Sequence, residues 1–252
     1  MRLTAGEWVC YSTPGRRGMM SVVNPSSATL TTRALTPDTW EDFAALVEAN
    51  NGVWGGCWCM GFHVEGLPPD RTAVGNRDAK RAHVRNGTAH QILVFAGDEC
   101  VGWCQYGRPA ELPNIKNRER YDAALRALPD WRIGCIFTAT RYRRHGVARA
   151  AVSAALEAIR RAGGGLVEAY PEQVDGRAAL RGAYLHTGPE TLFEEFGFIR
   201  ERQIAKWRWV MQLQVDGEAG DHKARPPGIQ AEARRSDRAP AGRGERKHRS
   251  DS

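Results

Sequence analysis

Long hydrophobic runs are absent from this sequence. No stretch approaches the roughly 18 uninterrupted apolar residues that a membrane-spanning helix requires, and the first residues lack the compact apolar core of a signal peptide. We therefore expect a soluble, cytoplasmic protein without a membrane partner. Because 42% of the 252 residues are hydrophobic, the chain can still bury a full core.

The spacing of the cysteines favours neither a disulfide framework nor a zinc knuckle. The six cysteines are Cys10, Cys57, Cys59, Cys100, Cys104 and Cys135. In a cytosolic chain of this size we expect reduced thiols. Cys57, Cys59 and His63 could begin a zinc site, but paired zinc-binding cysteines usually stand two to four residues apart, and no second pair follows. We predict no metal site and interpret these cysteines as small buried side chains.

The body of the chain also lacks a strong excess of positive charge. The formal net charge is +7, but residues 216–252 hold nine Lys or Arg against seven Asp or Glu, and the first 29 residues hold three Arg and one Glu. About three positive charges remain for the body, which is too few for a basic face. Nucleic acid is therefore a disfavoured partner.

The two ends of the chain differ in composition from its middle. Residues 1–28 mix Gly, Pro, Ser and Arg without a sustained period, and residues 216–252 contain almost no large apolar residues. A segment of the second kind cannot repay the entropy of folding. We predict a flexible extension over 1–28, one domain over 29–215 and a disordered basic tail over 216–252.

Strand and helix patterns alternate between these ends. The patterns predict strands over 29–35, 132–139, 166–170 and 207–215, a hairpin over 90–107, and helices after Pro37, over 147–162 and near Pro189. This order predicts an α/β domain with a mixed sheet.

The stretch "RYRRHGVARAA", residues 141–151, joins a predicted strand to a predicted helix. The first N–H groups of a helix have no internal partner and lie at the positive end of its dipole, so they bind a pyrophosphate well. Gly146 lets the backbone approach a phosphate without an intervening Cβ. A nucleic-acid helix would carry cations along an exposed face, yet none follows Arg149 until Arg160. We interpret the stretch as a pyrophosphate-binding loop, with a solvated surface run as the alternative.

Several motifs in this order resemble one known family. "RRHGVA", residues 143–148, fits the pattern [QR]-x-x-G-x-[GA], and "LFEEFGF" fits [YF]-E-x-x-G-F. Together with "LTTRALTPDTWEDF", "GDECVGW" and "CIFTATRY", they make residues 30–215 similar to the GNAT superfamily of acyl-CoA-dependent N-acyltransferases, and most similar to a bacterial group that carries "CWCM" and "VEAYP" segments. The resemblance implies a single domain with a mixed, mostly antiparallel central sheet flanked by helices.

The resemblance also implies acetyl-CoA as co-substrate and direct attack of a primary amine on its thioester in a ternary complex. The backbone of Ile136, Phe137 and Thr138 would pair with the pantetheine arm, and an N–H near Ile136 would stabilise the oxyanion. The strands over 132–139 and 166–170 would splay around the thioester. The residues implied to wrap the pyrophosphate are Arg143, Arg144, His145, Gly146, Val147, Ala148 and Arg149.

Proton transfers are the least determined part of this expectation. An ammonium of pKa about 10 must lose a proton before attack. Many members of the family use a tyrosine in the late helix as the acid, and Phe193 stands at the matching position. Tyr170 and Tyr184 are candidates for the acid in its place. Glu168 is the candidate base, and the alternative is that it is an edge or solvent-facing strand residue without a catalytic role. A thiolate leaves well enough that no dedicated acid is required.

The acceptor is expected to be a small-molecule or peptide amine, and a homodimer is left open. Three alternatives to the predicted mechanism and function stay open. Cys135 could act as a nucleophile through an acyl-enzyme. A CoA-binding sensor without turnover would be consistent with Phe193. A nucleic-acid-binding protein would use residues 141–151, here called the arginine loop.

Overall fold

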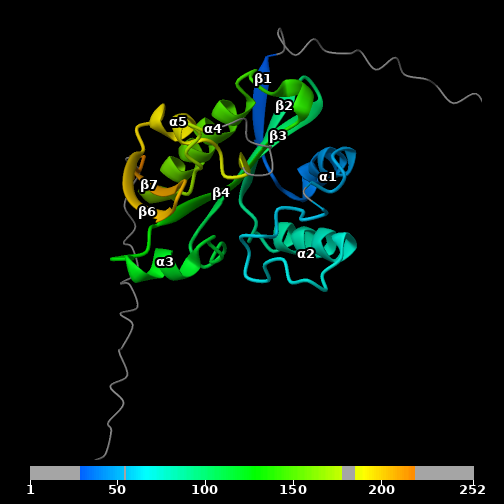
Figure 1. The fold of residues 1–252 in the computed structure, drawn as a ribbon. Coiled ribbons are helices and arrows are strands. Elements are labelled where there is room, and N and C mark those ends of the chain that lie inside the picture. The colour runs from blue at the N-terminus through cyan, green and yellow to red at the C-terminus, as the bar shows by residue number, and fades with distance from the viewer. Residues whose placement is uncertain (1–28, 54, 178–184, 219–252) are drawn as a thin grey trace, which may run out of the picture. The chain divides into compact units, whose positions relative to one another are not determined.

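The computed structural model describes residues 29–53, 55–177 and 185–218 of the chain (Figure 1). Its strands are β1 Leu30–Ala34, β2 Gln91–Ala96, β3 Glu99–Gly107, β4 Trp131–Thr138, β5 Gly164–Ala169, β6 Ile199–Ala205 and β7 Arg208–Asp216. Its α-helices are α1 Trp40–Ala49, α2 Ala73–Arg85, α3 Arg118–Ala123, α4 Val147–Arg161 and α5 Glu190–Glu194, and short 3-10 turns cover Pro37–Thr39 and Thr140–Tyr142.

The strands of the described residues form one sheet in the order β1-β2-β3-β4-β5-β7-β6. All neighbouring pairs are antiparallel except β4 and β5, which are parallel. The mixed, mostly antiparallel sheet with flanking helices confirms the predicted fold class. No helix of the described part of the chain is long and apolar enough to cross a bilayer.

Helices α1 and α4 cover opposite faces of the sheet (Figure 1). Neighbouring residues of β3 show this, because successive side chains of a strand point to opposite faces. Trp103 packs against Phe43 of α1 with ring centroids 5.2 Å apart. A Cβ at Gly102 would lie 2.5 Å from Val147 Cγ1 of α4, so only glycine lets this helix pack so closely on the strand.

Helices α2 and α3 and strand β6 were not predicted from the sequence. The buried face of α2 carries Asn76, Lys80 and Val84, so polar side chains occupy positions where an amphipathic helix normally shows apolar ones. The predicted extension 1–28 and residues 219–252 of the predicted tail lie outside the described residues. Strand β7 ends at Asp216, and the Glu218 N–H donates to the Arg160 carbonyl at 3.1 Å. The predicted domain limits otherwise stay a prediction.

Strands β4 and β5 separate near the middle of the sheet. They pair only through residues 131–133 and 167–169, although β4 continues to Thr138. Residues 185–190, here called the bridging segment, lie between the separated ends. The Ile136 N–H of β4 donates to the His186 carbonyl at 2.7 Å, and the Glu172 N–H donates to the Gly188 carbonyl at 3.1 Å. The gap between the strands is therefore spanned by a segment from much later in the chain.

Candidate active site

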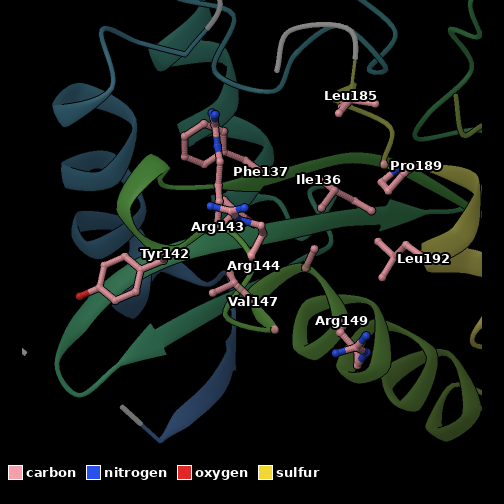
Figure 2. Close-up of a pocket in the computed structure, with 14 residues that line it drawn as sticks. Ile136, Phe137, Tyr142, Arg143, Arg144, Val147, Arg149, Leu185, Pro189 and Leu192 are labelled. Carbon is pink, nitrogen blue, oxygen red and sulfur yellow. The ribbon is translucent and has the colours of Figure 1, made fainter. Parts of the chain in front are cut away.

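A first cavity of about 460 Å³ lies beside β4 and the start of α4 (Figure 2). Three parts of the chain form it: the end of β4, the turn that leads into α4, and the bridging segment with α5. Its described lining consists of Ile136, Phe137, Thr138, Tyr142, Arg143, Arg144, Gly146, Val147, Ala148, Arg149, Leu185, Gly188, Pro189 and Leu192.

Gly146 lines this cavity at the point where α4 begins. It precedes the first residue of α4 and has a φ of +82°, a left-handed conformation that favours glycine. A Cβ built at this position would meet no atom within 4 Å, so the space above the glycine is open. The unpaired N–H groups at the start of the 15-residue helix α4 therefore face room for an anion.

Nine of the ten residues implied to bind acyl-CoA line the first cavity, and His145 does not. The exposed His145 places its Nδ1 2.8 Å from the Arg143 carbonyl oxygen. Arg149 lines the cavity, but its guanidinium donates to both carboxylate oxygens of Glu195 at 2.6 and 3.0 Å. Part of the charge of Arg149 is therefore already neutralised by a neighbour.

Sequence reasoning missed the far wall of this cavity. Leu185, Pro189 and Leu192 approach β4 from the bridging segment and α5 (Figure 2). No local pattern indicates this approach, since these residues stand about 50 positions after the strand that they face. The only local signal was the predicted helix start near Pro189, where α5 does begin.

A second cavity of about 400 Å³ lies across β4 from the first. Its described lining consists of Cys57, Cys59, Gly61, Phe62, Leu67, Asn114, Ile115, Lys116, Cys135 and His186. Cys135 lines the second cavity and Ile136 the first, as expected for adjacent residues of a strand. His186 and Leu185 divide between the cavities in the same way. The Ile136–His186 hydrogen bond therefore lies where the two cavities come together.

The second cavity is mostly apolar, and no carboxylate stands among its described lining residues. Its cationic group is Lys116, which is largely exposed. Three of its lining residues are thiols with different acidities. Burial raises the pKa of Cys57 to about 12 and the pKa of Cys135 well above its ordinary value. For Cys59, burial also raises the pKa, but a hydrogen bond from Cys135 and the charge of Lys80 outweigh it and lower the pKa.

The predicted base Glu168 and acid Tyr170 line neither described cavity. Glu168 is fully buried and accepts hydrogen bonds from the hydroxyls of Tyr121 and Tyr170 at 2.7 and 2.9 Å and from Gln212 Nε2 at 3.1 Å. Arg202 forms an ion pair with it at 3.6 Å. Burial and the Glu168 charge raise the pKa of Tyr170 well above its ordinary value. The geometry is that of a buried polar network, and the catalytic roles stay predictions.

The remaining sequence candidates are placed as follows. Tyr184 lies outside the described residues. Phe193 is fully buried, with its ring 5.2 Å from that of Phe198, and does not line the first cavity. For the zinc alternative, no group of three His, Cys, Asp or Glu side chains in the described ranges is placed to hold a metal ion. His63 Nε2 instead contacts Lys80 Nζ at 3.2 Å and Gln105 Nε2 at 3.0 Å.

The chain is similar to several solved structures, and one family model matches it. Among solved structures, the chain matches a Desulfovibrio desulfuricans protein assigned to the GNAT family of acetyltransferases, with 17% identity, a TM-score of 0.44, and coverage of 74% of this chain and 99% of that one. It matches the ribosomal-protein-S18-alanine N-acetyltransferase of Escherichia coli with 9% identity, a TM-score of 0.42, and coverage of 77% and 97%. It matches Arabidopsis thaliana NAA60 in complex with acetyl-CoA with 11% identity, a TM-score of 0.42, and coverage of 74% of this chain and 99% of that one. No functionally curated protein matches the chain.

The family assignment rests on sequence and not on these structural likenesses. The family model described as "Acetyltransferase (GNAT) family" matches residues 58–186, which is just over half of the chain. The match contains β4, α4 and β5, and of these the end of β4 and the start of α4 line the first cavity. The chain belongs to the GNAT family of acetyltransferases.

Proposed function

We propose that this protein transfers an acetyl group from acetyl-CoA to a primary amine, by direct attack in a ternary complex. The observation that carries the proposal is the position of the two cavities on opposite faces of β4. They come together at the Ile136–His186 pair, so a donor in one cavity and an acceptor in the other can meet there. Holding two reactants in this way lowers the entropic cost of the reaction.

The first cavity suits the donor. Its open floor at Gly146 and the free N–H groups of α4 favour a pyrophosphate, and Arg143 and Arg144 add charge beside it. The pantetheine arm would follow residues 136–138, as in the expectation from the family. These residues lead from the pyrophosphate loop toward the Ile136–His186 pair, which is the path that a thioester needs.

The second cavity suits a compact acceptor, either a small molecule or the end of a peptide. Its volume and apolar lining favour an amine that carries an apolar group. Leu67 lines the cavity and is half exposed, which extends the apolar surface to its rim. The acceptor's own identity is a matter for the experiment below.

A CoA-binding sensor without turnover is the second candidate, and one specific observation favours it. The oxyanion is expected to be stabilised by an N–H near Ile136, and the N–H of Ile136 itself already donates to the His186 carbonyl. Binding of nucleic acid by the arginine loop is disfavoured, because Arg141 and Arg149 already pair with Glu99 and Glu195.

The test uses the full-length protein, acetyl-CoA and three amines of different character: phenethylamine, spermidine and the dipeptide Ala-Phe. Loss of thioester absorbance measures turnover without a thiol reagent. We expect acetyl-CoA to raise the melting temperature and at least one amine to accelerate thioester loss. Stabilisation with no turnover on any of the three amines would favour the sensor, and absence of stabilisation would contradict both candidates.

A further inference from the structure

Lys116 brings a positive charge to the second cavity, and no carboxylate stands among the described residues that line the cavity with it. Within the described part of the chain, the Lys116 side chain forms no ion pair and no hydrogen bond. A lysine ammonium has three N–H donors, and a carboxylate is the partner that it pairs with most strongly. The ammonium of Lys116 is therefore available to an anionic group of a ligand.

The backbone that carries Lys116 is held in place beside the cavity. The Asn114 N–H donates to the Phe62 carbonyl at 3.2 Å, and Asn114 Nδ2 donates to the His63 carbonyl. Ile115, which stands between Asn114 and Lys116, is buried and lines the same cavity. Only the side chain of Lys116 has to be ordered when a ligand binds, which limits the entropic cost.

A cluster of charged side chains beside this cavity is also short of negative charge. Glu172 accepts hydrogen bonds from two guanidinium groups, that of Arg177 at 3.1 Å and that of the buried Arg208. Arg208 also donates to Thr187 Oγ1 at 3.3 Å, and Thr187 follows His186, which lines the second cavity. One carboxylate therefore serves two cations.

This cluster acts on Lys116. Burial and then the charge of Arg208 lower the pKa of Lys116, and the charge of Glu172 opposes them. Together the three cations Lys116, Arg177 and Arg208 face the single carboxylate of Glu172. An anion bound next to Lys116 would reduce the repulsion between these cations.

Acceptors of different charge would meet this cavity differently. A polyamine would bring further ammonium groups to Lys116 and find no carboxylate in the described lining. An amine with only an apolar group would cover Lys116 and leave it without a partner. An amine with both a carboxylate and an apolar group would pair with Lys116 and also fill the space beside Phe62, Leu67 and Ile115.

We propose that the acceptor is a primary amine that carries a carboxylate as well as an apolar group, and that Lys116 binds the carboxylate. This inference rests on the function proposed above and names the substrate class of the second cavity. A free apolar amino acid and a short peptide that ends in an apolar residue share this chemistry.

Calorimetric titration of the full-length protein saturated with CoA measures acceptor binding without turnover. Two pairs of ligands differ at the carboxylate: L-phenylalanine with phenethylamine, and Ala-Phe with Ala-Phe amide. We expect the carboxylate-bearing member of at least one pair to bind about fivefold more tightly, which is the upper range for a largely exposed ion pair. Equal affinities within both pairs, or tighter binding of the members without a carboxylate, would overturn the proposal.

Variants of Lys116 assign the preference to this side chain. Lys116→Met should remove it and Lys116→Arg should retain it, because only the second variant keeps the charge. Lys206→Met is the matched control, since Lys206 is also exposed but lines neither cavity. Salt at about 1 M should reduce the wild-type preference by screening the pair. An unchanged melting shift with CoA shows that Lys116→Met is folded, and a preference that persists in this variant would contradict the assignment.

Turnover with acetyl-CoA tests the same preference in catalysis and identifies the source of the carboxylate. The quantity compared is the ratio of kcat/KM within each pair, because the intrinsic reactivities of the two amines are the same for every variant and cancel. Lys116→Met should lower this ratio about fivefold, in the phenylalanine pair for a free amino acid and in the Ala-Phe pair for a peptide. A ratio that is unchanged in both pairs would overturn the proposal.

The failures of the two proposals are distinguishable. Acetylation of phenethylamine or spermidine, with ratios that do not depend on Lys116, overturns the substrate class and leaves the proposed function standing. Binding of a carboxylate-bearing amine through Lys116, without turnover of any amine, overturns the proposed function and leaves the binding site standing.

Discussion

The backbone N–H of Ile136 donates a 2.7 Å hydrogen bond to the carbonyl oxygen of His186. The family resemblance assigns an N–H near Ile136 to the oxyanion of the reaction. If Ile136 itself supplied that N–H, a thioester oxygen and the His186 carbonyl would compete for one donor. In that case we expect acetyl-CoA binding to release Ile136 from the bridging segment.

Gly188→Ala should disturb this arrangement. Gly188 has a φ of +78°, and a Cβ there would lie 3.1 Å from Phe193 Cε2 and 3.3 Å from Ile136 Cδ1. Gly176 has a similar φ of +71° but no atom within 4 Å of a Cβ, so Gly176→Ala is a matched control for backbone strain. Each change costs about 1–2 kcal/mol for the left-handed backbone. We expect only Gly188→Ala to weaken acetyl-CoA binding, by about tenfold or 1.4 kcal/mol, in calorimetric titration. Equal affinities for the two variants would contradict this.

Gly146→Glu should abolish stabilisation by acetyl-CoA. The substitution puts a side chain and a negative charge into the open space at the start of α4, where a pyrophosphate would lie. Gly163→Ala is the control, because Gly163 also has a positive φ, +97°, and open space around it, but lies at the opposite end of α4. Thermal unfolding with and without acetyl-CoA is the measurement. If Gly146→Glu showed the wild-type melting shift, the assignment of the loop would be wrong.

Glu168→Gln should lower stability more than it lowers catalysis. The change removes the charge of a fully buried carboxylate that accepts hydrogen bonds from Tyr121 and Tyr170, although Arg202 keeps Glu201 as a second partner. Loss of hydrogen bonds to a charged group typically costs about 1.5–3 kcal/mol. We expect urea unfolding to show a loss of this order, while kcat per folded molecule stays within a few-fold of the wild type. Tyr170→Phe, which removes one hydrogen bond to Glu168, serves for comparison. A collapse of kcat at unchanged stability would instead support Glu168 as the base.

Acidification should destabilise the protein through His63. Its folded-state pKa of about 2 lies below the ordinary 6.5, so the unfolded chain binds a proton that the folded chain excludes. Stability is therefore lost as pH falls below about 6.5, at up to about 1.36 kcal/mol per pH unit. Between pH 7 and pH 5 we expect the wild type to lose about 2 kcal/mol more than His63→Gln in urea unfolding. Parallel losses in the two proteins would show that His63 takes up its proton in the folded state.

Short-range patterns predicted the parts of the fold that depend on contiguous residues. The strand over 132–139, the glycine at 146 and the alanine-rich helix after it appear in the structure nearly as predicted, as β4, the N-cap and α4. Helix α2 was missed because Asn76 and Lys80 occupy its buried face. These polar side chains have polar partners inside the fold, because Asn76 Nδ2 donates to the Gly56 carbonyl and Lys80 Nζ contacts His63 Nε2.

The sequence by itself determined the turn at Gly146 and the start of α4, because both are properties of neighbouring residues. It also determined the family, through the motifs around that turn. Only the tertiary structure decided that Glu168 is buried in a network of tyrosines, and that Lys80, His63 and Gln105 come together from a helix, a loop and a strand. Such meetings depend on sheet order and on the packing of helices against it. Local hydrophobic periods do not encode either one, since they set which face of an element is buried and not what it is buried against.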